Sequence, residues 1–143
     1  MAPDWGWAEA RLRDAHNYWL ATTRPDGRPH LVPTWGAWID DALWFCTYRG
    51  TVKTVNLATE PRATIATETP GEVVLVEGSA LPVDERELPT AFAVAMAAKY
   101  GDGETGIGDE RTCYYRLAPV RARWFRESEA LSEPGRRTFS GRA

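Results

Sequence analysis

The fold is decided by residues 21–48, which read ATTRPDGRPHLVPTWGAWIDDALWFCTY. Pro25-Asp26-Gly27 is a turn signal, because proline presets φ, the aspartate side chain bonds nearby backbone, and glycine accepts positive φ. Asp40-Asp41 marks a second turn. Apolar and aromatic residues flank both turns, so the stretch predicts an antiparallel meander of three strands, over 18–24, 28–39 and 42–48.

Proline limits where the second strand of this meander can lie. Pro29 and Pro33 have no backbone N–H to donate, so the strand must lie at a sheet edge or carry a bulge. The rest of the chain predicts helices over 4–16, 51–59 and 84–100, and strands over 62–68, 72–81, 113–117 and 121–126, with Pro119 between the last two. A glycine-rich acidic loop is expected over 101–110.

Short antiparallel strands with inserted helices usually close into a small barrel. The sequence therefore predicts a mainly β protein built as one domain over 1–143, because no repeat or linker divides its 143 residues. Within it we expect a short N-terminal helix over 4–16, a barrel over 18–126 and a polar tail over 127–143. Steps of four residues predict one buried helix face, made by Leu88, Phe92, Met96 and Tyr100.

Composition argues against several classes of protein. The formal net charge of −3 disfavours a broad nucleic-acid-binding face. Two histidines, His16 and His30, and two distant cysteines, Cys46 and Cys113, predict no metal site. Two lone thiols, no apolar run of membrane length and no signal-peptide core lead us to expect a cytoplasmic protein with no membrane segment.

The segment Arg49-Gly50-Thr51-Val52-Lys53 follows the third strand and begins a predicted helix. The free N–H groups at a helix start attract anions, and Gly50 lets the backbone approach a ligand closely. A hydroxyl from Thr51 and the charges of Lys53 and Arg49 would complete a phosphate cradle. The alternative is a solvated helix start with Thr51 as its N-cap.

A second candidate feature is the segment PTWGAW, residues 33–38. Pro33 removes a ladder hydrogen bond and leaves neighbouring backbone groups free. A planar ring lying along this strand would meet those groups at its edge. The alternative is that Trp35 and Trp38 fill the core or a subunit interface.

Four segments carry a resemblance to a known family: YWLATTRPDGRPHLVPTWGAW, LWFCTYRGTVKTVNLATEPRATI, EVVLVEGSA and YRLAPVRARWF. In this order and spacing they resemble the pyridoxamine 5′-phosphate oxidase-like superfamily of flavin and deazaflavin oxidoreductases, over roughly residues 5–126. The resemblance implies a six-stranded antiparallel split β-barrel. It also implies a homodimer that binds FMN or the deazaflavin F420 at the subunit interface.

The resemblance also implies the residues of the cofactor site. The strand segment would run beside the ring, and the start of the following helix would hold the phosphate. The implied set is Val32, Pro33, Thr34, Trp35, Thr47, Tyr48, Arg49, Thr51 and Lys53. Val52 stands where family members commonly have arginine, and Arg49 is the candidate to replace that charge. Asn56 also matches the family, and we interpret it as a residue that structures the helix.

No Arg-x-His element follows RARWFRE, which argues against oxidation of pyridoxamine phosphate itself. The resemblance instead implies a reductase that passes a hydride between the cofactor and a small unsaturated or aromatic substrate. We expect no dedicated catalytic residue, although His30 and Tyr100 are possible proton donors and His30 more often would face the interface. The alternatives are a non-catalytic carrier of flavin, deazaflavin or haem, and a structural dimer.

Overall fold

The computed structural model describes residues 2–129 and 133–140. Its α-helices are α1 (Trp5–Asp14), α2 (Val52–Thr59) and α3 (Phe92–Tyr100), and short 3₁₀ turns occupy Glu85–Glu87 and Glu127–Glu129. Its strands are β1 (Tyr18–Thr23), β2 (Pro29–Thr34), β3 (Ala37–Ile39), β4 (Ala42–Tyr48), β5 (Arg62–Thr67), β6 (Glu72–Val83), β7 (Thr112–Arg126) and β8 (Gly135–Thr138).

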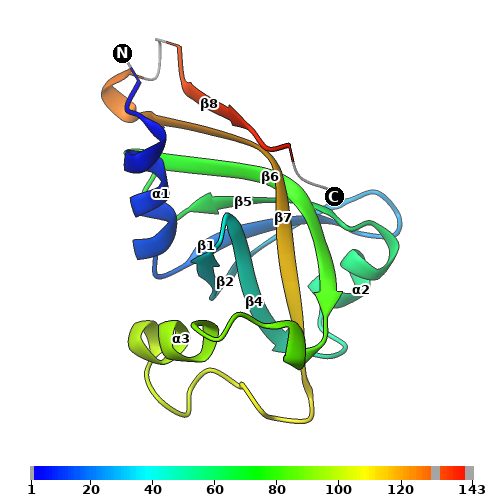
Figure 1. Cartoon of the computed structure of the whole chain (residues 1–143). Coiled ribbons are helices and arrows are strands. Elements are labelled where there is room, and N and C mark those ends of the chain that lie inside the picture. Colours follow the sequence, from blue (N-terminus) through cyan, green and yellow to red (C-terminus); the bar gives the residue numbers. More distant parts are fainter. Residues whose placement is uncertain (1, 130–132, 141–143) are drawn as a thin grey trace.

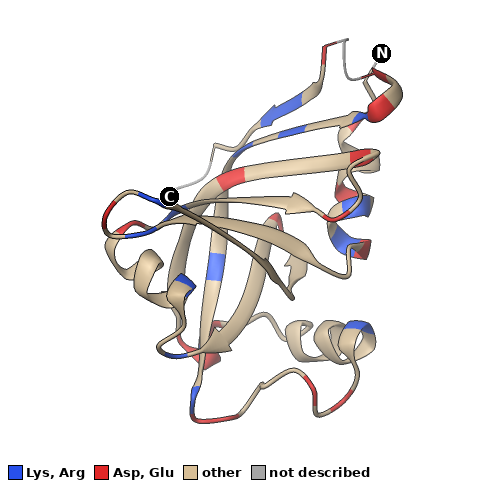
Figure 2. Cartoon of the chain, turned by 180° about the vertical axis from the view of Figure 1, so that it is seen from behind, with Lys and Arg blue, Asp and Glu red and all other residues tan. Residues whose placement is uncertain are grey.

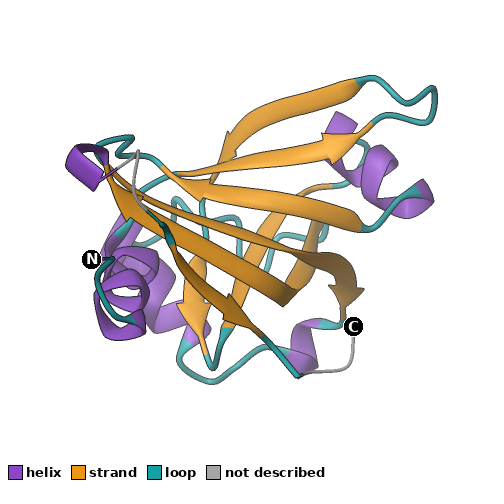
Figure 3. Ribbon diagram, turned by 90° about the horizontal axis from the view of Figure 1, so that it is seen from above, coloured by secondary structure: helices purple, strands orange, loops and turns teal. Residues whose placement is uncertain are grey.

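All of these strands belong to one antiparallel sheet, in the order β2-β1-β5-β6-β7-β4-β3, with β8 added beside β7. The sheet curls around a common interior, and the helices lie outside it (Figures 1 and 3). This is the split-barrel class that the sequence predicts, with eight strands in place of six. The two additional strands are β3 and β8.

The turns of the meander follow the predicted chemistry. Gly27 adopts a φ of 89°, and the Asp26 carboxylate accepts a hydrogen bond of 3.1 Å from the backbone N–H of Arg28. Asp40 and Asp41 both adopt positive φ, 51° and 54°. Such a pair makes a tight hairpin turn whose twist matches that of its strands.

The predicted strand over 28–39 is wrong as one element, because the chain leaves the sheet between β2 and β3. At that break the N–H of Gly36 donates to the hydroxyl of Tyr100 at 3.0 Å instead of to a neighbouring strand. The edge position expected from the prolines is confirmed. β2, which holds Pro29 and Pro33, pairs with β1 alone in the described sheet.

The two strands predicted over 113–117 and 121–126 form one continuous strand, β7. Pro119 lies opposite Gly78, at a register shift between Glu77 and Gly78 in β6. A Cβ at Gly78 would lie 2.1 Å from the carbonyl oxygen of Ala118. Glycine therefore lets the two backbones pass closely enough for pairing to continue past the proline.

The predicted helix over 84–100 begins too early. Asp84 caps only the 3₁₀ turn, accepting from the backbone N–H of Arg86, and α3 starts at Phe92. Leu88 is extended, with φ −66° and ψ 141°, because Pro89 disfavours the helical conformation of the residue before it. The predicted face is confirmed in part, since Phe92 and Met96 are buried in one apolar cluster with Trp44 and Tyr114, and Tyr100 and the preceding Leu88 pack against it partly buried.

Part of the C-terminal segment, predicted to be a polar tail, packs against the barrel. Residues 135–138 form β8, which pairs with β7, and Phe139 packs against the barrel core. The parts of the predicted tail over 130–132 and 141–143 lie outside the described residues. The barrel core itself is a separate cluster of buried side chains that includes Leu20, Phe45, Ile65, Val76 and Leu117.

Candidate functional site

The start of α2 is open in the way an anion site requires. Gly50 adopts a φ of 81° and Thr51 occupies the N-cap position, but the Thr51 side chain makes no capping hydrogen bond. Among the described residues, the backbone N–H groups of Val52 and Lys53 have no acceptor. The alternative interpretation of Thr51 as a cap that satisfies the helix is therefore not supported.

Lys53 lies half-buried beside these N–H groups. Within the described chain its ammonium has neither a hydrogen bond nor an ion pair. Burial lowers the pKa of Lys53, and the nearby Cys113 thiol opposes the shift. An unpaired cation that is partly removed from water is costly, so this position favours an anionic partner.

Asn56 fixes which face of α2 lies against β1. Asn56 is buried, and its side-chain amide donates to the hydroxyl of Thr22 on β1 at 3.0 Å. Lys53 lies three residues before Asn56 and so shares its face of α2, toward the barrel. Our interpretation of Asn56 as a helix-structuring residue was too narrow, because it also fastens α2 to β1.

His30 and Arg24 reach the same place from the β1–β2 hairpin. His30 lies opposite Thr22 in the strand pair, on the side that faces α2, and both Arg24 and Lys53 are close enough to lower its pKa after burial. The structure places His30 near Lys53, and the expectation that His30 also faces a subunit interface stays a prediction. Side chains alternate between the two faces along β2, and this alternation places His30 on the same face as its buried partner Thr22.

The side chains of Thr47, Tyr48 and Arg49 have three different environments in the structure. Thr47 shares the inner face of the barrel end with Cys113, which is its partner across β4 and β7. Tyr48 is 47% exposed, with the Arg111 guanidinium 4.9 Å from its ring centroid. Arg49 donates to the carbonyl of Glu110 at 2.9 Å, so the 101–111 loop holds the residue expected to replace the missing family arginine.

The residues predicted on the strand segment lie on different faces of the sheet. Val32 and Thr34 lie opposite the inward-facing Leu20 and Tyr18, whereas Pro33 lies opposite the exposed Trp19. Strand alternation thus places Val32 and Thr34 on the α2 side and Pro33 on the outer face. Whether any of them contacts a cofactor stays a prediction.

The two tryptophans of PTWGAW have different environments. Trp38 is 5% exposed and belongs to the barrel core, which is the alternative that the sequence left open. Trp35 is 37% exposed and stacks on Tyr100, with ring centroids 4.2 Å apart and an interplanar angle of 5°. The Tyr100 hydroxyl donates to the carbonyl of His16, which holds the stacked pair in place.

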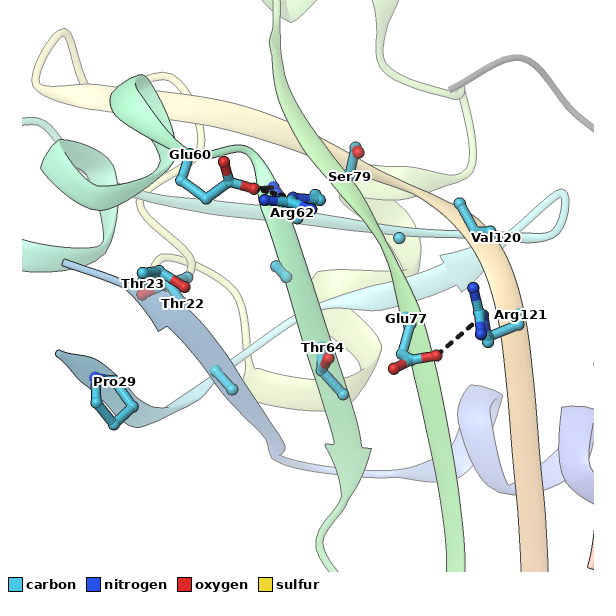
Figure 4. A pocket seen from close by; sticks show the side chains of 13 residues that line it. Thr22, Thr23, Pro29, Glu60, Arg62, Thr64, Glu77, Ser79, Val120 and Arg121 are labelled. Atoms are coloured by element: carbon cyan, nitrogen blue, oxygen red, sulfur yellow. Dashed lines mark hydrogen bonds and ion pairs between the residues drawn. The ribbon is translucent and has the colours of Figure 1, made fainter. Parts of the chain in front are cut away.

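A separate hollow lies over β1, β5, β6 and β7 (Figure 4). Its volume is about 590 Å³, and none of the nine predicted cofactor residues lines it. Its two arginines, Arg62 and Arg121, are paired with Glu60 and Glu77. Because these charges are already neutralised, the hollow is a poorer anion site than the start of α2.

Lys53 is the only charged residue of α2, whereas Glu60 is its C-cap residue and further acidic residues lie in the loop after α3 (Figure 2). The described residues contain no group of three or more His, Cys, Asp or Glu side chains that could hold a metal ion. Both cysteines are free thiols. None of the helices in the described part of the chain combines the length and apolar character needed to cross a bilayer.

Three solved structures illustrate what the fold is similar to. A conserved hypothetical protein from Mycobacterium tuberculosis is 25% identical, with a TM-score of 0.75, over 99% of this chain and 94% of its own. A haem-binding protein from Mycobacterium smegmatis is 22% identical, with a TM-score of 0.75; the match covers 96% of this chain but only 59% of that protein. An F420 reductase is 23% identical, with a TM-score of 0.65, over 80% of this chain and 94% of its own.

A search of curated protein sequences finds no match. The profile of the pyridoxamine 5′-phosphate oxidase family, however, matches residues 8–125, from α1 to the end of β7. That span includes the meander, the start of α2 and the whole long β6–β7 pair. The chain belongs to the pyridoxamine 5′-phosphate oxidase-like split-barrel family.

Proposed function

We propose that this protein is an FMN- or F420-dependent oxidoreductase that passes a hydride to a small unsaturated or aromatic substrate. The observation that carries the proposal is Lys53, a half-buried ammonium without a partner in the described chain, beside two free backbone N–H groups of α2. Membership of the family supplies the class of ligand, since both cofactors carry a phosphate group.

The residues present fit a phosphate. The N–H groups of Val52 and Lys53 would donate to its oxygens, and the Lys53 ammonium would neutralise charge. The Thr51 hydroxyl, which does not cap the helix and makes only a 3.5 Å contact to the Thr54 hydroxyl, would add a further donor. Val52 adds no charge, and Arg49 is held by the 101–111 loop. The phosphate would therefore depend on one lysine more heavily than in relatives with an added arginine.

When bound, the cofactor supplies the hydride chemistry, and the protein positions it. Tyr100 is poorly suited to give up a proton in such a reaction. Burial raises the pKa of Tyr100 to about 12, and its hydroxyl already donates to the carbonyl of His16. We therefore assign Tyr100 a positioning role for Trp35 and Gly36 and name no catalytic residue.

We also propose that the active form is a homodimer with the cofactor near the interface. The outer face of β1 and β2 exposes large apolar side chains, with Trp19 at 43% and Leu31 at 61%. A second copy of the chain would remove this surface from water, and exposed apolar patches of this kind mark interaction sites. Sedimentation equilibrium measures the subunit number directly.

The test of the proposed cofactor is a titration of cofactor-free protein with FMN and, separately, with F420, followed by the fluorescence of each. Saturable binding of one of them supports the proposal and names the cofactor. Hydride transfer is then measured with the reduced cofactor and a panel of nitroaromatic and α,β-unsaturated compounds. Failure to bind either cofactor would overturn the proposed function.

A carrier of haem is the second candidate, and the likeness to a haem-binding protein is what favours it. His16 is exposed and packs edge-on against Tyr100 at 4.9 Å between ring centroids, whereas His30 is only partly exposed, so each is tested as the axial ligand. Adding haemin separates the candidates. A new absorption band that is lost in His16→Ala or in His30→Ala would favour the carrier over the reductase.

A further inference from the structure

Three basic side chains gather where the β1–β2 hairpin meets the start of α2. Arg24 comes from the end of β1, His30 from β2 and Lys53 from α2. Thr22 and Asn56 hold the two elements together through their hydrogen bond of 3.0 Å. Since Thr22 is opposite His30 and Asn56 is one turn from Lys53, the same contact brings the imidazole and the ammonium together.

One ring nitrogen of His30 lacks a hydrogen-bond partner in this position. Its ring is partly exposed, but its Nδ1 atom is shielded from solvent and has no hydrogen-bond partner. A buried ring nitrogen without a partner is costly whether it carries a proton or not. A rotation of the partly exposed ring would bring Nδ1 to an incoming acceptor.

Among the described residues, no carboxylate forms an ion pair with any of these three groups. Arg24 acts on the carboxylate of Asp26, whose pKa is lowered first by Arg28 and then by Arg24. Asp26 is engaged in an ion pair of 2.7 Å with Arg28. The other titratable group is the Cys113 thiol, which acts on Lys53. The cluster therefore carries excess positive charge.

We infer that Arg24 and His30 extend the phosphate site of Lys53, and that His30 takes up a proton when a phosphate or sulfate dianion binds. A protonated imidazole has donors at both ring nitrogens, so Nδ1–H would gain an acceptor and the dianion would gain a third cation. This inference rests on the proposed function for the identity of the natural ligand, but its first test does not.

The direction of the linkage follows from the charges. In the free protein, burial and then Arg24 and Lys53 lower the pKa of His30 below its ordinary value of 6.5. A bound dianion stabilises the imidazolium and raises that pKa. Between the two pKa values, binding consumes a proton. Affinity for the anion therefore falls as pH rises, by at most about tenfold per pH unit.

The first experiment measures the pKa of His30 by ¹H NMR, with and without sodium sulfate. The chain has only two histidines, so the resonance absent in His30→Gln assigns His30 and the other serves as an internal control. Sulfate is a suitable probe because it keeps its charge across the titration. We expect sulfate to raise the pKa of His30 by at least about half a unit and to leave His16 unchanged.

The second experiment measures FMN affinity above about pH 7, where the phosphate monoester of FMN, with a second pKa near 6, no longer titrates. We expect the affinity of the wild-type protein to be lower at pH 9 than at pH 7, by a factor that the pKa of His30 in the FMN complex sets. His30→Arg should bind equally well at both pH values, because its charge is permanent, and His30→Gln should be uniformly weak. Riboflavin, which has no phosphate, should show no such pH dependence.

The outcomes separate this inference from the proposed function. A sulfate-induced pKa change with no cofactor binding would keep the anion site and reject the oxidoreductase. Cofactor binding with an unchanged His30 pKa, and with affinity independent of pH, would reject the proton-linked site alone. A pH dependence that survives in His30→Arg would also reject it, since the titrating group would then be another residue.

Discussion

The chain has only two lysines, Lys53 in α2 and Lys99 in α3, and these two helices use the same side chain differently. The helices lie on opposite sides of the barrel (Figure 1), and both lysines are half-buried with lowered pKa values. Lys99 donates to the Tyr18 hydroxyl at 3.0 Å and to the Gly36 carbonyl at 2.9 Å. Lys53 has no such acceptor among the described residues.

The hydrogen-bond partners of the two ammonium groups distinguish a structural cation, Lys99, from one that is free to bind a ligand, Lys53. The donors of Lys99 are directed to atoms of β1 and the β2–β3 connection, so its burial is compensated within the fold. The burial of Lys53 is uncompensated until an anion arrives. Partial burial and a lowered pKa are therefore shared by both roles, and only the hydrogen-bond partners separate them.

The largest expected effect is on cofactor binding. Lys53→Met removes the charge but keeps an apolar stem, and we expect it to weaken the phosphate-bearing cofactor by about 10- to 100-fold, as for a hydrogen bond to a charged group. Fluorescence titration measures the affinity. Lys99→Met is the matched control and should remain within about threefold of the wild type. Equal losses in both variants would contradict the distinction.

The next effect is on stability, and it runs in the opposite order. Lys99→Met leaves the carbonyl of Gly36 and the hydroxyl of Tyr18 with one donor fewer, so we expect it to lower the free energy of unfolding by about 1–2 kcal/mol. Lys53→Met should leave stability unchanged or slightly raised. Urea denaturation of the cofactor-free proteins measures both. A larger loss for Lys53→Met would show that Lys53 has a structural partner.

A smaller effect is expected from adding charge. Val52 is 45% exposed at the start of α2, and Val94 is 72% exposed on α3. Val52→Arg should strengthen the phosphate-bearing cofactor by less than about tenfold, because an exposed ion pair contributes about 1 kcal/mol or less. Val94→Arg adds the same charge on the other helix and should have no effect. Equal gains would indicate only long-range attraction, which 0.5 M salt would remove.

The smallest effect is the pH dependence contributed by Lys99. Burial lowers the pKa of Lys99 from 10.5 to about 8, so between these values the unfolded chain holds a proton that the folded chain has released. Stability should therefore rise with pH in this window, by less than about 1 kcal/mol because water screens a half-exposed ammonium. Urea denaturation at about pH 8 and pH 9.5 measures the rise. An equal rise in Lys99→Met would assign it to another group.

Much of the fold was predictable because its signals are local. The Pro25-Asp26-Gly27 turn, the Asp40-Asp41 turn and the edge position of β2 all follow from the φ preferences and hydrogen-bonding groups of a few adjacent residues. The errors arose where distant segments decide. Gly78 lets β7 continue past Pro119, and the pairing of β8 with β7 is invisible in a polar stretch read alone.

In the candidate site, too, local features were predictable from the sequence and long-range contacts were not. The sequence alone identifies Gly50, Thr51 and Lys53 as the start of a helix with a cation, since spacing and helix geometry are sufficient for that. Only the tertiary structure shows that Thr51 does not cap the helix, that Lys53 has no partner in the described chain while Lys99 has two, and that His30 belongs beside Lys53. These are contacts between strands and helices far apart in sequence, and no local pattern specifies them.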